Sequence, residues 1–191
     1  MKNTPTYIES FVEAARTYVK RALADEEGFD SGLGLDGSET SLAFVDHYIR
    51  KTNLAQVAAT SKEKATALMA LVAPALGAYF GEIAIAKFGG QWQCPPDREH
   101  EPADWRIVLE TGGLEFSPVG MAAAALAGGD ADGYDGSFTV RPDLMERLET
   151  ALSESPPVDE DYYYSLTGRL ETLSQVVELL GEIERQRHLR N

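Results

Sequence analysis

Apolar residues recur three or four positions apart over most of the chain, which is the spacing of one face of a helix. In the first predicted helix, residues 5–24, this face consists of Ile8, Phe11, Val12, Ala15, Val19 and Leu23. The same spacing predicts helices over residues 39–51, 119–127 and 142–152, and a last helix that begins near Asp159. The pattern indicates a predominantly helical protein.

The most apolar segment is residues 65–86, which contain a single charged residue, Glu82, in 22 positions. Large side chains occupy one face of the predicted helix, and alanine and glycine occupy the other. A helix that is apolar all round is normally buried. Thr60 and Glu63 have the spacing of a capping box at its start, and Gly89-Gly90 are expected to end it. We therefore expect a buried central helix.

The same segment is long enough to span a membrane. Pro74 and Glu82 interrupt it, however, and lysines flank both ends, so the flanks carry no orientation signal. We favour the core helix, bent near Pro74, and expect no membrane insertion.

Strand patterns follow the central helix. Residues 91–94 form a short strand pattern, and residues 105–110 and 114–117 flank Thr111-Gly112-Gly113. Glycines tolerate the positive φ angles of tight turns, so the last two segments are predicted to pair as an antiparallel hairpin. The predicted class is α+β, predominantly helical, with a small antiparallel sheet. The length fits one domain over residues 1–191, with its core at about residues 5–187.

Cysteine usage and the N-terminus bear on the compartment. Cys94 is the only cysteine, so no intramolecular disulfide can form, which is typical of a reducing compartment. Residues 1–5 lead into an amphipathic helix and not into an apolar signal core. These features predict a cytoplasmic protein.

The net charge of −14 limits the classes of partner. Residues 93–140 carry nine acidic and two basic residues, which is half of that net charge. A nucleic-acid interface needs clustered Lys and Arg to neutralise phosphates, and the chain has no such cluster. Anionic membrane surfaces are disfavoured for the same reason. A basic protein is the partner that the charge favours, although acidic surfaces often serve solubility alone.

Glu82 is the first candidate functional residue. A carboxylate in an apolar helix must be paired, hydrogen-bonded, protonated or open to a cleft. We predict that it is largely buried and bonded outside its own helix, either as an anchor for a strand or loop or as a general acid or base. Tyr79 and Trp92, whose polar tips need partners when buried, are candidate binding residues beside it.

These residues also carry a family resemblance. Gly77-x-Tyr79-x-Gly81-Glu82, followed by Gly89-Gly90-x-Trp92 and later by Ser117-Pro118, resembles an uncharacterised family of bacterial proteins, a domain of unknown function. In that family a helix leads to a Gly-Gly-x-Trp strand, a hairpin and a Ser-Pro segment that opens a helix. The resemblance covers roughly residues 65–125. It implies a fold but no activity, cofactor or partner.

Metal and cofactor motifs do not fit. The segment Asp130-x-Asp132-Gly133-x-Asp135-Gly136 has Tyr134 and Arg141 where a calcium loop needs ligands. Cys94 and His100, with the acids near them, lack the spacing of a zinc site. The chain has no P-loop, nucleophile elbow or complete dinucleotide fingerprint. We expect no metal and no cofactor, and we identify no catalytic residue.

Three consecutive tyrosines, residues 162–164, cannot all point the same way on a helix. At least one is expected on the surface, so Tyr162 and Tyr164 are further candidate binding residues. Two hypotheses remain. The first is a protein-interaction or regulatory module, of inhibitor or immunity type, that uses its acidic surface. The alternative is a small enzyme with Glu82 as its general acid or base.

Overall fold

The computed structural model describes residues 4–24, 35–95, 101–156 and 158–190, and the fold is given for these. It is a predominantly helical α+β fold with a small antiparallel sheet. The α-helices are α1 (Thr6–Leu23), α2 (Leu42–Thr52), α3 (Leu54–Thr60), α4 (Lys62–Phe88), α5 (Pro118–Ala127), α6 (Pro142–Ser153), α7 (Glu160–Tyr163) and α8 (Leu166–Arg190). Short 3-10 turns lie at η1 (Glu39–Ser41), η2 (Pro102–Asp104) and η3 (Thr111–Gly113).

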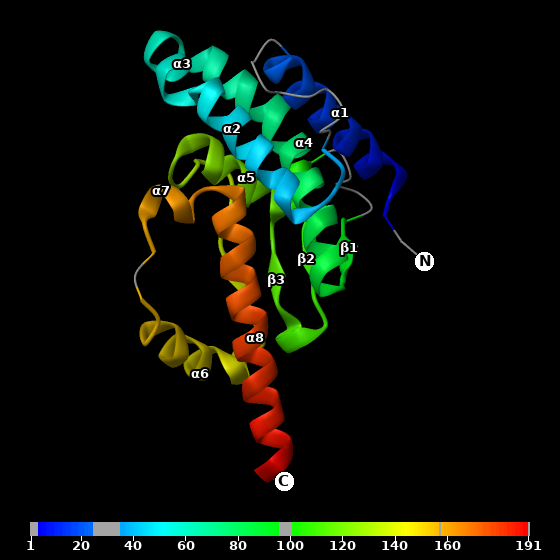
Figure 1. The fold of residues 1–191 in the computed structure, drawn as a ribbon, viewed down its shortest axis with the longest axis vertical. Coiled ribbons are helices and arrows are strands. Elements are labelled where there is room, and N and C mark those ends of the chain that lie inside the picture. The colour runs from blue at the N-terminus through cyan, green and yellow to red at the C-terminus, as the bar shows by residue number, and fades with distance from the viewer. Residues whose placement is uncertain (1–3, 25–34, 96–100, 157, 191) are drawn as a thin grey trace.

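Helices α1 to α3 and the start of α4 lie at one end of the molecule, and the rest of α4 continues beside the sheet (Figure 1). Helix α8 runs past the sheet to the C-terminus. Helix α4 packs against α1 on one side and α5 on another, and α6 packs along the distal part of α8. Gly77 lets α4 and α5 approach closely, because a Cβ there would lie 2.6 Å from the Cα atom of Val119.

The sheet contains β1 (Gln91–Gln93), β2 (Arg106–Val108), β3 (Glu115–Phe116) and β4 (Phe138–Thr139), paired in that order and all antiparallel. Ile107 pairs with Phe116, and both side chains are buried. Gly112 and Gly113, at φ 64° and 59°, turn the chain between β2 and β3. The predicted hairpin is confirmed, as is the strand before it.

The central helix is confirmed over its second half. From Val72 to Ala84 every residue of α4 except Glu82 is buried, and Gly89 ends the helix at φ 77°. The first half is different, since Ala67, Ala70 and Leu71 are exposed. By length and composition α4 would qualify as a membrane span, but 67% of its most apolar stretch is buried within the fold, as in a core helix.

Several local predictions are wrong. Residues 54–60, which lie between two predicted helices, form a further helix, α3. It starts directly after Asn53, which is in the left-handed conformation. The cap of α4 is Ser61 and not Thr60, because the Ser61 hydroxyl accepts from the backbone N–H of Lys64. The last predicted helix is broken into α7 and α8, and strand β4 had no counterpart in the sequence pattern.

Candidate functional site

Glu82 links three separate segments of the chain. Its Oε1 atom accepts hydrogen bonds from the Thr4 hydroxyl and from the indole N–H of Trp92, both at 2.9 Å. The prediction of a partner outside its own helix is confirmed. Its side chain is partly buried, less so than the residues on either side of it. The carboxylate fastens the N-terminal segment and β1 to α4.

Gly81 explains why Trp92 can reach this carboxylate. A Cβ at position 81 would lie 2.6 Å from two atoms of the Trp92 ring, so only glycine leaves room for the indole over α4. The Trp92 ring also meets Trp105 edge to face, with centroids 6.4 Å apart. Trp105 packs in turn on Tyr7 and Phe11 of α1. The Gly-Glu pair of the motif thus joins the helix, the sheet and α1.

Tyr79 is engaged elsewhere. Its hydroxyl accepts the backbone N–H of Gly37 at 3.0 Å and shares a hydrogen bond of 2.6 Å with Ser41. The side chain is buried, and this burial raises the pKa of its hydroxyl above the ordinary value. Tyr79 therefore holds the segment before α2 against the central helix.

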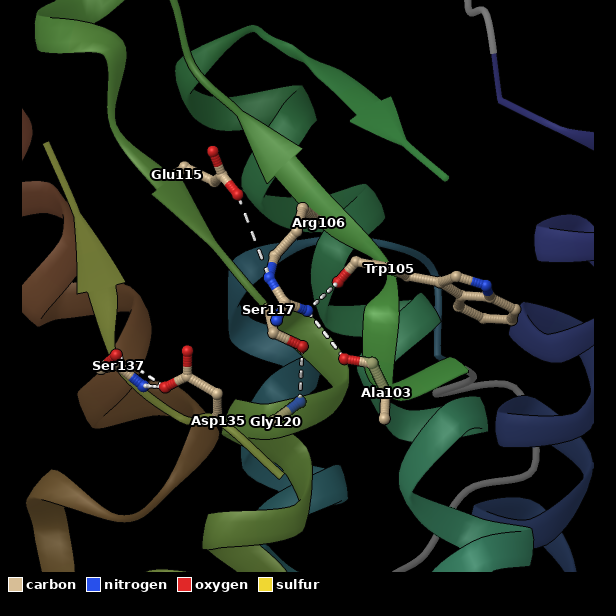
Figure 2. A network of polar contacts seen from close by, with 8 residues as sticks. All are labelled: Ala103, Trp105, Arg106, Glu115, Ser117, Gly120, Asp135 and Ser137. Atoms are coloured by element: carbon tan, nitrogen blue, oxygen red, sulfur yellow. Dashed lines mark hydrogen bonds and ion pairs between the residues drawn. The ribbon is translucent and has the colours of Figure 1, made fainter. Parts of the chain in front are cut away.

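Arg106 organises a polar network at the hairpin, drawn in Figure 2. Its Nη1 atom donates to the carbonyls of Ala103 and Trp105, at 2.7 and 3.1 Å, and its Nε atom lies 4.0 Å from the Glu115 carboxylate. In the same view the Ser117 hydroxyl accepts from the N–H of Gly120 and caps α5. These contacts account for the Ser-Pro part of the motif as a helix start.

Tyr162 and Tyr164 lie at a different place from Glu82, on a cavity of about 600 Å³ that we name the Tyr162 cavity. Its lining comes from α2, the end of α5, α7 and the start of α8: Ala43, Asp46, Ile49, Arg50, Ala125, Gly128, Asp161, Tyr162, Tyr164, Ser165 and Thr167. Tyr162 is 40% exposed. Its hydrogen bond to the Glu171 carboxylate is the main reason that its pKa rises to about 12.

Tyr164 contributes to a stack below the surface. Its ring meets that of Tyr163 at 5.2 Å, and the buried Arg169 guanidinium lies 4.1 Å from the Tyr163 ring centroid and 5.0 Å from that of Tyr164. Tyr162 is exposed, as the sequence predicted for at least one of the three, and Tyr163 and Tyr164 are partly buried.

Asp46 was missed by the sequence analysis. This buried carboxylate on α2 accepts from the backbone N–H groups of Leu166 and Thr167, at 2.8 and 3.1 Å, and from the Thr167 hydroxyl at 2.6 Å. It therefore caps the N-terminus of α8 from another helix. A signal was present, because Asp46 lies among Leu42, Val45 and Ile49 on the predicted inner face.

A second hollow was also missed. It has a volume of about 390 Å³, and α3, α4 and the loop after α5 line it, so we name it the α3–α4 groove. Its lining is mostly small and apolar: Leu54, Ala55, Ala58, Ala65, Thr66, Met69, Ala70, Ala127, Asp130, Ala131, Asp132 and Tyr134. Asp130 and Asp132, the charged residues in this lining, are acids of the glycine-rich loop considered for calcium.

Metal binding has no geometric support in the part of the chain that the structure describes, where no group of three or more His, Cys, Asp or Glu side chains converges. The Asp135 carboxylate is bonded to the N–H and hydroxyl of Ser137, which lowers its pKa. The other metal candidate paired Cys94 with His100. Cys94 is half-buried, and this burial raises the pKa of its thiol. His100 lies outside the described residues.

The structure thus brings Glu82 and Trp92 together, turns Tyr79 toward a structural contact, and separates Tyr162 and Tyr164 from all three. Comparison of the chain with family models, curated proteins and solved structures finds no significant match. The family resemblance therefore stays a prediction.

Proposed function

We propose that this protein is an interaction module that binds a basic protein partner at the α3–α4 groove. The observation that carries the proposal is the lining of the groove, which combines small apolar side chains with Asp130 and Asp132 and, among the described residues, includes no Lys or Arg. An apolar floor beside carboxylates suits a partner segment that presents both apolar and basic side chains.

Two further features support a protein partner. Leu71 of α4 is 56% exposed, an apolar side chain on the surface apart from the groove residues of the same helix. Exposed apolar surface with a polar rim is typical of protein interfaces. The net charge of −14 attracts a basic partner at long range and raises the rate of encounter. The proposal includes inhibitors and immunity-type proteins, which cover the surface of a basic effector.

The alternative, a small enzyme that uses Glu82, has less support. Glu82 is hydrogen-bonded to Thr4 and Trp92, two residues of the fold itself. It lines neither the Tyr162 cavity nor the α3–α4 groove. These contacts favour a structural role for the carboxylate.

Affinity purification from the source cells tests the proposal. The wild type should retain a basic protein in stoichiometric amount, and the double variant Asp130→Asn with Asp132→Asn should lose it. The matched control, Glu160→Gln with Asp161→Asn, removes the same charge beside the Tyr162 cavity and should retain the partner. Retention by the groove variant and loss by the control would overturn the assignment to the groove. A co-purifying small ligand without a protein would favour the enzyme.

A further inference from the structure

We propose that the element bound in the α3–α4 groove is an amphipathic α-helix, with its apolar face on the groove and Lys or Arg side chains beside Asp130 and Asp132. This inference rests on the proposed function and names the conformation of the partner segment. It follows from the shape of the groove walls, the placement of charge, and the absence of features that other kinds of peptide need.

The walls of the groove are two helical surfaces rich in alanine. Ala55 and Ala58 lie three residues apart on α3, and Met69 and Ala70 lie on the facing part of α4. Residues three or four apart on a helix occupy one face. Small side chains at a contact allow another helix to approach closely, because interaxial distance depends on the side chains between the axes. The groove can therefore accommodate a third helix packed against α3 and α4.

The two carboxylates of the groove lie on one side of it, in the loop after α5. Asp130 and Asp132 come from the loop after α5, whereas the α3 and α4 walls contribute uncharged side chains to the groove. A bound helix can thus place apolar residues at every third or fourth position on the walls and its basic residues toward the loop.

Other modes of peptide recognition fit less well. Addition of a strand needs a sheet edge of useful length, but the edge strands β1 and β4 have three and two residues. Proline-rich segments dock on aromatic-lined grooves, and Tyr134 is the one aromatic side chain among the described residues of this lining. Phosphorylated segments need clustered arginines, and the part of the lining that the structure describes has no arginine. A helix in a groove is the mode that remains.

The test uses fluorescent synthetic peptides of about 18 residues, about five helical turns. One peptide places Leu and Lys at helical spacing. A second has the same composition in strict alternation, and a third replaces Lys with Glu at helical spacing. Fluorescence anisotropy with the wild-type protein should show the helical Leu/Lys peptide binding about tenfold or more tightly than the alternating one. The Leu/Glu peptide should not bind.

Protein variants locate the binding. Ala55→Arg fills the groove and should weaken the helical Leu/Lys peptide about tenfold or more. Ala43→Arg is the matched control, because it places the same charge on an exposed alanine of α2 at the Tyr162 cavity; it should change little. Circular dichroism should show that both variants fold and that the bound peptide gains helix.

The outcomes separate the two proposals. If the helical and alternating peptides bind equally and Ala55→Arg weakens both, the proposal that the bound segment is a helix is wrong. The proposal of a basic partner at the groove then still holds. No binding of either basic peptide would overturn the proposed function as well. Equal weakening by Ala55→Arg and Ala43→Arg would show that the peptide is held by overall charge and not by the groove.

Discussion

At the scale of single residues, two carboxylates connect distant parts of the chain. Glu82 joins Thr4 and Trp92 to α4, and Asp46 joins α2 to the start of α8. Both follow from the rule that a carboxylate removed from water keeps hydrogen-bond partners. Only Glu82 was singled out by the sequence, because it is the one charge in a long apolar segment. Asp46 lies in an ordinary amphipathic helix, where its inward position does not reveal which group it meets.

The structural role of Glu82 predicts a clear order of stability among its variants. Glu82→Gln keeps an Oε1 acceptor for Thr4 and Trp92 and should cost little. Glu82→Leu leaves the indole N–H without a partner and should lower the free energy of unfolding by about 1–3 kcal/mol. Urea denaturation followed by circular dichroism measures both. Equal stability of the two variants and the wild type would mean that these hydrogen bonds contribute nothing.

Removal of the Asp46 carboxylate should be costly because it caps a helix from inside the protein. Asp46→Ala leaves the N–H groups of Leu166 and Thr167 unsatisfied, and we expect a loss of about 1–3 kcal/mol in unfolding free energy. Asp161, an exposed acid that lines the Tyr162 cavity as Asp46 does, provides the control. The unfolding free energy of Asp161→Ala should stay within about 0.5 kcal/mol of the wild-type value. Chemical denaturation of the two variants decides between a cap and an incidental contact.

Tyr162 should titrate late because its hydroxyl donates to Glu171. The pKa of about 12 lies above the usual value of 10, so the neutral hydroxyl is the form that the fold favours. Its contribution to stability is present below the unfolded pKa and is lost as the pH rises through the folded one. Glu171→Gln removes the anionic acceptor and should bring the pKa down. Ultraviolet titration of tyrosinate, with Tyr162→Phe to assign the signal, measures the change.

At the scale of elements, the patterns that succeeded are the long or strongly marked ones. Helix α4 was predicted because its apolar segment is 22 residues long and contains one charge, and the β2–β3 hairpin was predicted because Gly112-Gly113 marks its turn. Helix α3 and strand β4 are seven and two residues long, too short for a periodicity to show. The break between α7 and α8 arises where Asp46 caps α8, a contact between residues 120 positions apart.

The α3–α4 groove could not be predicted for a related reason. Its walls come from residues 54–70 and its acidic side from residues 127–134. Each segment alone suggests an ordinary helix surface or a polar loop. Only the packing of α5 against α4 brings the loop to the exposed half of the central helix.

Glycine substitutions should separate close packing from helix propensity. In Gly77→Ala the new Cβ would lie 2.6 Å from the backbone of Val119, so α4 and α5 must move apart, at a cost of about 1–3 kcal/mol. In Gly181→Ala nothing lies within 4 Å of the new Cβ, and the helix should gain about 0.5–1 kcal/mol. Thermal melts should move in opposite directions. A melting temperature of Gly77→Ala that rises with that of Gly181→Ala would show that α4 and α5 need not approach so closely at Gly77.

At the scale of the whole molecule, the net charge of −14 acts on stability and on association in opposite ways. Carboxylates spread over one small fold repel one another, which disfavours the compact state, and the same field draws in a basic partner. The same acidic surface therefore lowers the stability of the fold and raises the rate at which a basic partner associates. Salt separates the two effects, because it shortens the Debye length from about 10 Å at 0.1 M to about 3 Å at 1 M.

We therefore expect added sodium chloride to raise the urea midpoint of the free protein while it slows association with the helical Leu/Lys peptide. The rise follows from screening of self-repulsion, and the slower association follows from loss of steering, which acts on the association rate more than on dissociation. Stopped-flow anisotropy gives the two rates separately. The variant Asp130→Asn with Asp132→Asn, which removes two of the local carboxylates, should show a smaller dependence of the association rate on salt than the wild type. A peptide whose association rate is independent of salt, with an unchanged urea midpoint, would mean that the acidic surface acts in neither process.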